Sequence, residues 1–437
     1  MNIEKILAEA DKYDELYVNI RRDFHKYAEL SWLEFRTTSK IMEFLMERGI
    51  PVYCGTDVIN PEYVWSFPTK EVLEFHKKRA IEQGANPVMI EKMGDYTGCM
   101  AVIETGKPGP VIAIRADIDC NDIGEAQDED HRPYREGFAS VNPKFMHACG
   151  HDGHAVMAMF AAAILNDVKE ELCGTIKVIF QPGEEGDKGA KSMAESGILD
   201  DVDYIMAIHI QRTNGEYPVL ASCQKGHLST TKFDVRIHGK ASHSGAYPEE
   251  GKNAIMAAVM AIGGMNGFLQ DGRGMARLNI GTIEGGTGRN VIPESCYFKA
   301  ETRGATTEVE QRVYNRAIAC VKAACEAYEC SYETEIVGAA SVVDSDEDFK
   351  AAIMEAVKVV PELKGTVLNY PATGATDDFN YLLEKVQQHG GKGSYMALYS
   401  SQPGANHNNR YDFDECCLKA GVKVFLANTC YLMEHEV

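Results

Sequence analysis

The sequence predicts an α/β fold that is interrupted by an inserted α+β domain. Residues 98–210 alternate short apolar strands with helical segments, and this alternation is typical of a sheet that carries helices on its faces. From about residue 226 the strands lengthen and alternate polar with apolar residues, and the first pattern returns near Ser341. We therefore predict a discontinuous main domain, residues 1–225 and 339–437, and an inserted domain, residues 226–338.

Five apolar segments define the main domain. The runs Val111–Ile114, Ile176–Phe180 and Tyr204–Ile208 are short and apolar, as buried strands are. Between the first two lies Gly153–Asn166, whose alanine, methionine and leucine residues favour a helix. A late apolar segment, Leu418–Leu432, predicts a further helix after the α/β pattern has resumed.

The inserted domain combines strands and helices. Thr231–His238 alternates with a period of two, and Tyr297–Thr302 does so less regularly. Helical patterns cover Asn253–Phe268 and Val309–Tyr328. Residues 56–97 are rich in aromatic and charged side chains, and we expect an irregular excursion there.

Composition and charge narrow the functional classes. The hydrophobic and charged fractions, 45% and 25%, are those of an ordinary soluble protein. The formal net charge of −21 argues against nucleic acid and anionic membranes as partners, because both would be repelled. No apolar run approaches the roughly 20 residues of a membrane span, and the N-terminus lacks the apolar stretch of a signal peptide. We expect a cytoplasmic protein.

The thirteen cysteines do not indicate disulfides, because their number is odd and their spacing shows no framework. Most are expected to be reduced and to fill apolar space. Cys149 differs from the others because it lies in MHACGHDGH, a segment of nine residues with three histidines and an aspartate. Burying such a cluster would be costly without an ion or hydrogen-bond partners.

Polar clusters follow or end each of the three predicted strands. Arg115-Ala-Asp117 follows the first strand, Gln181–Gly186 the second and His209 the third. In open α/β sheets the carboxyl ends of the strands form the binding crevice. The three clusters together are therefore better evidence for a site than any one of them.

The residue types in these clusters are those of a metal site. Cys149 and His151 can bend toward one ion if Gly150 makes a tight loop, and thiolate with imidazole suits zinc or a similar metal. The pair Glu184-Glu185, together with His209 and His407, extends the set to a number of ligands that suits two metals. One glutamate can ligate while the other takes a proton from the attacking water and passes it to a leaving amine.

Simpler interpretations remain open for single residues. His209 alone is more often a hydrogen-bonded interior histidine than a ligand, and His407 alone is an ordinary loop histidine. Glu184 and Glu185 could be solvated surface residues. His151 and His154, three residues apart, could instead form a helical metal pair.

Five segments, in this order, resemble one known family: MHACGHDGH, QPGEEG, a histidine at the third strand, GKASHSGAYPEEGKNAI and HNNRYDFDE. They are similar to the amidohydrolase branch of the aminoacylase and carboxypeptidase G metallopeptidases, and Arg22–His25 is similar to the N-terminal signature of that branch. The resemblance runs from about residue 20 to the C-terminus. It implies a metallopeptidase-type catalytic domain, with the insertion serving as a lid and dimerisation domain.

The resemblance also implies roles for individual residues. It makes Glu184 the general acid and base, and it makes His243 a donor that crosses a dimer interface to the tetrahedral oxyanion. Two divalent metal ions, Zn or Mn, would be held by five ligands, which are Cys149, His151, Glu185, His209 and His407.

Substrate binding is implied for the lid. Arg289 and Asn290 would hold the α-carboxylate of the substrate, and Arg303 either joins them or pairs with Glu301. In the wider peptidase family the first strand ends in His-x-Asp, whereas here Arg115 replaces the histidine and cannot ligate. Asp117 is then at most an orienting group.

The expected activity is hydrolysis of an N-acyl amino acid. Narrower details, among them HRPYR at residues 131–135 and the loop GGTGRNVIPES, are similar to members that act on p-aminobenzoyl-glutamate. The alternatives are a general N-acyl-amino-acid or peptide deacylase, or a structural subunit of a hetero-oligomeric hydrolase. We expect an anionic small-molecule substrate and a homodimer, or a heterodimer with a homologous subunit.

Overall fold

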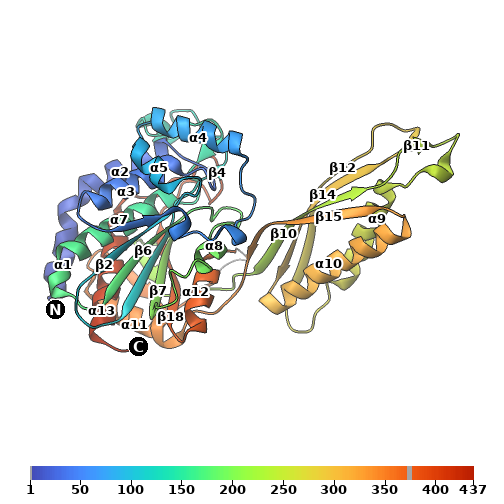
Figure 1. Ribbon diagram of the computed structural model, residues 1–437. Helices are drawn as coiled ribbons and strands as arrows, with labels where there is room; N and C mark the ends of the chain where they lie inside the picture. The colour runs from blue at the N-terminus through green and yellow to red at the C-terminus, as the bar shows by residue number, and fades with distance from the viewer. Residues whose placement is uncertain (1, 372–375) are drawn as a thin grey trace. The chain divides into compact units, whose positions relative to one another are not determined.

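The computed structural model describes residues 2–371 and 376–437, which fold into two compact units (Figure 1). The large unit comprises residues 2–225, 344–371 and 381–437, and the small unit comprises Gly226–Val343 with residues 376–380. The boundary expected after residue 338 falls inside strand β15 (Ser331–Ala340).

The large unit is built on one eight-stranded sheet. Its strands, in spatial order, are β1 (Val52–Cys54), β2 (Cys99–Glu104), β6 (Thr175–Gln181), β3 (Val111–Asp117), β7 (Tyr204–Arg212), β18 (Lys392–Ser400), β8 (Val219–Ala221) and β16 (Gly365–Val367). The central strands β6, β3, β7 and β18 pair in parallel, so their carboxyl ends meet at one edge. The predicted α/β architecture is confirmed.

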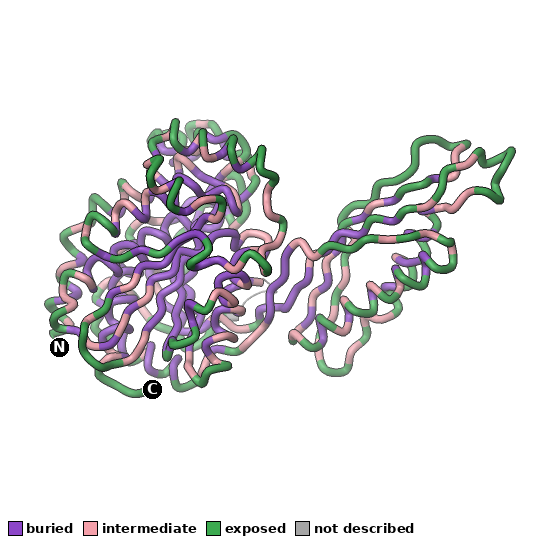
Figure 2. The backbone as a smooth tube through the Cα atoms, in the orientation of Figure 1, coloured by how far each residue is buried: buried purple, intermediate pink, exposed green. Residues whose placement is uncertain are grey.

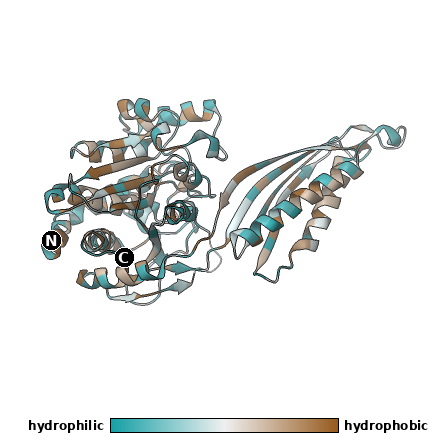
Figure 3. Cartoon of the chain, turned by 60° about the horizontal axis from the view of Figure 1, so that its bottom comes forward, coloured by the Kyte–Doolittle hydropathy of each residue, from teal (hydrophilic) through white to brown (hydrophobic). Residues whose placement is uncertain are grey.

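Apolar helices cover this sheet. Helix α7 (His151–Asp167) is buried from His151 to Leu165, as expected for an alanine- and methionine-rich segment between two strands. Helix α13 (Cys416–Glu434) is long and apolar enough to cross a membrane, yet it is 83% buried inside the unit and serves as a core helix. Figure 2 shows the buried centre, and in Figure 3 its strands are coloured largely as hydrophobic. Further helices of this unit are α1 (Ile3–Glu9), α2 (Asp14–Lys26), α3 (Phe35–Met46), α6 (Arg132–Arg135), α8 (Ala190–Ala194) and α11 (Glu347–Ala356).

The prediction of an irregular excursion at residues 56–97 is wrong. This region contains two helices, α4 (Lys70–Glu82) and α5 (Pro87–Met93). Only Leu73, His76 and Ala80 of α4 are buried, so the helix presents a narrow inward face. Because most of its residues are charged or aromatic, the sequence shows little of the helical periodicity of its buried residues.

The small unit is a four-stranded antiparallel sheet with two helices. Its strands are β12 (Ala276–Gly285), β14 (Ser295–Gly304), β10 (Ser229–His238) and β15, in this order. Helices α9 (Ala254–Met265) and α10 (Thr307–Ala327) pack on one another and on the sheet, around Phe233 and Phe298. A separate ribbon pairs β11 (Ser242–His243) with β13 (Val291–Ile292).

The remaining short elements are β4 (Asn121–Asp122), which pairs with β5 (Phe145–Met146), β9 (Gln224–Lys225), which pairs with β17 (Tyr370–Pro371), and α12 (Phe379–Gln388).

Candidate metal centre

The segment Cys149-Gly150-His151 makes a tight loop between β5 and α7. Gly150 has a φ of 92°, and a Cβ at this position would lie 2.7 Å from the hydroxyl of Tyr411. Both the left-handed backbone and the close approach therefore require glycine. The loop turns the side chains of Cys149 and His151 toward the carboxyl edge of the sheet.

Cys149 belongs to two groups of possible metal donors. The first group contains His151 and His209, and the second contains Glu185 and His407; within each group the donor atoms lie within 4.8 Å of one another. The Cys149 Sγ is 3.3 Å from the Nε2 of His209. The five residues proposed from the sequence thus come together as two sets of three that share one sulfur.

One buried donor atom in these sets, the Nε2 of His151, has no hydrogen-bond partner among the described residues. The other nitrogen of His151, Nδ1, lies 3.3 Å from Asp119 Oδ1. A metal ligand has this arrangement, in which one nitrogen is held by a carboxylate and the other is left for the ion.

His209 lies inside β7, paired with Ala397 of β18, and not after the strand as expected. The strand continues beyond His209 because β18 pairs with it as far as Arg212. The Nδ1 of His209 is 2.8 Å from the carbonyl oxygen of Ile210. Since a carbonyl only accepts, Nδ1 carries the proton, and Nε2 is the atom that faces Cys149.

His407 reaches the site from a polar loop that precedes α13. Its backbone N–H donates to the carbonyl of Ala148 at 2.8 Å, and its Nε2 lies 3.3 Å from the Oε1 of Glu185. Its φ of 63° is uncommon for a residue with a side chain, and such backbone strain concentrates at functional sites.

The turn after β6 carries the two glutamates. Both backbone N–H groups donate to Asp119, that of Glu184 at 3.1 Å and that of Glu185 at 3.0 Å, and the hydroxyl of Ser31 donates to the same carboxylate at 2.7 Å. The Oε2 of Glu184 lies 3.7 Å from the Nε2 of His151.

Asp119 was missed from the sequence, although it holds both this turn and His151. The available signal was the spacing Asp117-Ile-Asp119, which places two carboxylates at the end of one strand.

His154 is occupied by protein partners. Its Nδ1 lies 2.6 Å from Asp117 Oδ1, and its Nε2 accepts the backbone N–H of Ile210 at 2.8 Å. Burial lowers the pKa of His154 to about 4, so the ring is neutral. This arrangement leaves neither nitrogen for a metal and disfavours the His151–His154 pair. Asp117 orients His154 and is itself paired with Arg115 at 2.6 Å.

The electrostatics of the site favour positive charge. Burial alone would raise the pKa of Cys149, but the nearby charge of His209 lowers it to about 5, which makes the thiolate available. Hydrogen bonds to Cys149 and Glu185 raise the pKa of His407 to about 10. Burial opposes ionisation of Glu185 as well, yet the contact with His407 lowers its pKa to about 2. Because the thiolate of Cys149 and the carboxylate of Glu185 stabilise nearby positive charge, they are suited to binding divalent metal ions.

In the small unit, the ribbon brings the expected lid residues together. His243 is paired with Val291, and the N–H of Ser244 donates to the carbonyl of Asn290 at 3.1 Å, next to Arg289. The Nδ1 of His243 lies 3.2 Å from the N–H of Gly245 and 3.1 Å from that of Ala246. Since Nδ1 accepts, the proton is on Nε2, which can donate.

Arg303 is placed differently. Its Nε and Nη2 lie 3.1 and 3.2 Å from the carboxylate oxygens of Glu301. The sequence left this pairing open as an alternative. Because the Glu301 carboxylate already pairs with the guanidinium of Arg303, less of its positive charge is available to a substrate carboxylate.

Comparison with known proteins identifies the group to which this architecture is similar. The model of peptidase family M20/M25/M40 matches residues 113–428. One of the subunits of the p-aminobenzoyl-glutamate hydrolase of Escherichia coli (strain K12) is 38% identical over 410 residues, which cover 94% of each chain. The indole-3-acetyl-aspartic acid hydrolase of Enterobacter agglomerans is 38% identical over 404 residues, 92% of each chain.

Two solved structures extend the comparison. An aminobenzoyl-glutamate utilization protein from Klebsiella pneumoniae matches with a TM-score of 0.82 and 32% identity, covering 99% of this chain and 98% of the other. The YXEP protein of Bacillus subtilis, described as a dinuclear metal-binding peptidase of the M20 family, matches with a TM-score of 0.67 and 26% identity, covering 97% and 99%.

Proposed function

The chain belongs to peptidase family M20/M25/M40 and is an amide-bond metallohydrolase, and on that basis we propose that it cleaves the amide of an N-acylated acidic amino acid. The observation that carries this proposal is the pair of donor sets that share Cys149. The leading substrate is p-aminobenzoyl-glutamate, which the name of the Escherichia coli relative specifies for that protein.

We propose that the five donors hold two divalent ions, Zn or Mn. The buried Nε2 of His151, which has no partner among the described residues, supports this, as does the mixed set of sulfur, nitrogen and oxygen donors. The thiolate favours zinc by its softness, whereas the carboxylate is equally suited to manganese. When bound, the ions would polarise the amide carbonyl and increase the acidity of the attacking water.

The protein's part in the chemistry is proton transfer and charge stabilisation. Glu184 is placed to take the proton of the attacking water and to deliver it to the nitrogen of the leaving amine, because its carboxylate lies beside the donor set while its backbone is fixed by Asp119. His243, with its proton on Nε2, is the proposed donor to the oxyanion, acting from the small unit of a partner chain.

The acidic product defines the polar part of the substrate site. The names of the two 38% identical relatives specify conjugates of glutamate and aspartate, so an acidic amino acid is their shared feature. Arg289 and Asn290, adjacent to His243 in the ribbon, are proposed to hold the α-carboxylate. Arg303 is the weaker candidate because Glu301 already pairs with it.

We propose that the small unit forms the contact with a second protein chain. Met256, Val259 and Met260 on α9 are 42%, 51% and 49% exposed and lie on one helix face, and β12 is an edge strand of its sheet. An exposed apolar face beside a free edge is typical of an interface. The partner is a second copy or a homologous chain, since the name of the Escherichia coli relative describes it as one of the subunits of its enzyme.

A reduced, cytoplasmic environment is proposed from the cysteines, because all thirteen are free.

A panel of conjugates tests the proposal. The purified chain is first analysed for bound metal, and release of the amino acid is then measured for p-aminobenzoyl-glutamate, indole-3-acetyl-aspartate and N-acetyl-cysteine. We expect metal-dependent turnover, abolished by chelator and restored by Zn or Mn, with the acidic conjugates preferred. Comparable rates on all three would favour a general deacylase, and absence of both metal and turnover would refute the enzymatic proposal.

A further inference from the structure

Helix α2 carries two buried cations that the proposed chemistry does not use. Arg21 and His25 are both fully buried, and His25 belongs to the N-terminal motif RDFH. A charged side chain is seldom buried without a specific partner. Both cations face the same carboxylate, that of Asp152.

Asp152 is the residue next to His151, in the first turn of α7. Its Oδ2 lies 2.8 Å from the Nε of Arg21 and 2.8 Å from the Nδ1 of His25. Its Oδ1 accepts the backbone N–H of Gly153 at 2.9 Å. The carboxylate therefore links helix α2 to the backbone of the first turn of α7, which follows directly on the loop that carries Cys149 and His151.

Arg21 also reaches a second ligand-bearing segment. Its Nη2 lies 2.9 Å from Asp412 Oδ1, and its Nη1 lies 3.3 Å from Glu415 Oε1. Asp412 follows Tyr411, whose hydroxyl lies against Gly150, and it is five positions after His407 in the sequence. One guanidinium thus joins the start of α7 to the segment that follows the His407 loop, although these are far apart in the chain.

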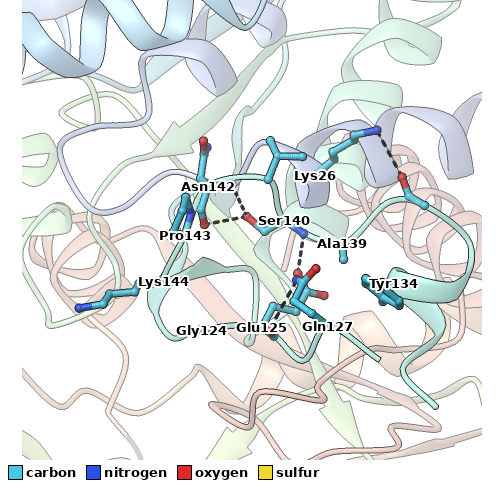
Figure 4. Close-up of a pocket in the computed structure, with 12 residues that line it drawn as sticks. Lys26, Gly124, Glu125, Gln127, Tyr134, Ala139, Ser140, Asn142, Pro143 and Lys144 are labelled. Atoms are coloured by element: carbon cyan, nitrogen blue, oxygen red, sulfur yellow. Dashed lines mark hydrogen bonds between the residues drawn. The ribbon is translucent and has the colours of Figure 1, made fainter. Parts of the chain in front are cut away.

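His25 is held from its other side as well. Its Nε2 lies 3.0 Å from Glu125 Oε1, so both ring nitrogens face carboxylates and both must donate. Burial opposes its charge, but Glu125 and the hydrogen bond to Asp152 raise the pKa of His25 to about 9. Glu125 in turn lines a surface pocket and accepts the backbone N–H of Ser140 at 2.6 Å (Figure 4).

We propose that Arg21 and His25 are positioning residues for the metal centre and act through Asp152. Two fixed cations on one carboxylate orient the first turn of α7, so that the Nε2 of His151 and the Sγ of Cys149 are presented together before any metal binds. Arg21 couples that turn to the segment after His407. This inference rests on the proposed metal site and adds residues outside it that set its affinity.

The test is metal affinity, measured by titrating chelator-treated protein with Zn²⁺ against a competing chelator. Arg21→Lys keeps the charge but cannot span Asp152 and Asp412. We expect about 10- to 100-fold weaker binding, the effect typical of groups that orient metal ligands. The matched control is Arg36→Lys, because Arg36 is also buried and is bidentate to Asp23 at 2.8 and 2.9 Å, but holds no ligand-bearing segment. The Tm of each metal-free variant is measured in parallel.

A second pair of variants separates positioning from general stability. The amide nitrogen of asparagine falls near the Nδ1 position of histidine, and that of glutamine falls near Nε2. His25→Asn therefore keeps a donor toward Asp152, whereas His25→Gln keeps one toward Glu125. Weaker Zn²⁺ binding by His25→Gln than by His25→Asn is expected.

The outcomes distinguish this inference from the function on which it rests. Equal Zn²⁺ affinity in wild type, Arg21→Lys and Arg36→Lys, or equal affinity in the two His25 variants, would overturn the positioning role. If Arg21→Lys does not fold, the His25 pair alone decides. If wild type itself binds no Zn²⁺ or Mn²⁺, the metal site and the proposed function fail with it.

Discussion

The Sγ of Cys149 lies 3.3 Å from the Nε2 of His209, although one residue precedes α7 and the other lies within β7. A thiol and an imidazole in contact form a donor pair in which the sulfur is readily ionised. Since Cys149 also belongs to the set with Glu185 and His407, its sulfur is the element common to both halves of the site.

Cys149→Ser should therefore disrupt both halves. A hydroxyl does not ionise at neutral pH, so Zn²⁺ affinity should fall by more than the roughly 100-fold that outer groups can cause. Chelator competition measures this change. Cys173→Ser is the control, because Cys173 precedes β6 at the opposite end of that strand from Glu184, and its substitution should leave metal affinity within about twofold. Unchanged binding by Cys149→Ser would remove Cys149 from the ligand set.

Substitutions of the two adjacent glutamates should have different effects on turnover and metal content. Glu184→Gln removes the proposed proton carrier, so kcat should fall about 10²- to 10⁴-fold, with metal content unchanged. Glu185→Gln removes a ligand, so the metal content measured by elemental analysis should fall as well. If Glu184→Gln loses its metal while Glu185→Gln keeps it, the two roles are exchanged.

His243 should act between protein chains. His243→Ala should lower kcat by about 10²- to 10³-fold, as loss of an oxyanion donor does, and should leave metal affinity unchanged. His243→Gln, which retains a donor near Nε2, should be less impaired. Mixing inactive Glu184→Gln and His243→Ala chains should restore about a quarter of wild-type activity, because half of randomly formed dimers then contain one intact site. No recovery after verified chain exchange would place His243 in the site of its own chain.

The small unit should mediate assembly. Met260→Glu introduces a charge into the exposed face of α9, so the protein should dissociate at micromolar concentration. Analytical ultracentrifugation follows the change in mass. Phe75→Glu is a suitable control, because Phe75 is 66% exposed on α4 of the large unit. If wild type and Met260→Glu associate equally, the exposed face of α9 is not the interface.

His25 should make stability depend on pH. Its pKa is raised from 6.5 to about 9 in the folded protein, so its contribution is fully present below pH 6.5 and is lost as the pH rises through 9. The loss is on the order of 3 kcal/mol. The groups that face the ring are Glu125, Asp152, Arg21 and the neutral His147.

Denaturant unfolding of the metal-free protein between pH 6 and 9.5 measures this contribution. The difference in unfolding free energy between wild type and His25→Gln should shrink across that range. A constant difference would show that folding does not raise the pKa of His25.

Local pattern was sufficient for much of the fold. The strands around Ile112, Ile176 and Ile205, and the apolar helix that begins near His151, were predicted from continuous apolar runs bounded by polar residues. Helix α4 was missed because only three of its side chains face inward, and so sparse a face gives little periodicity to read.

The sequence by itself determined the kind of site. The Cys149–His151 loop, together with polar clusters after or near the ends of three predicted strands, indicated a hydrolytic metal centre, because the carboxyl ends of adjacent parallel strands lie at one edge of the sheet. The sequence could not show which ring nitrogen of each histidine is available to bind a metal ion. Only the tertiary structure shows that Asp117 and Ile210 occupy both nitrogens of His154, whereas the Nε2 of His151 is left unpartnered among the residues that the structure describes. Nor could local sequence reveal that Arg21 joins Asp152 to Asp412, because these contacts depend on packing between segments hundreds of residues apart.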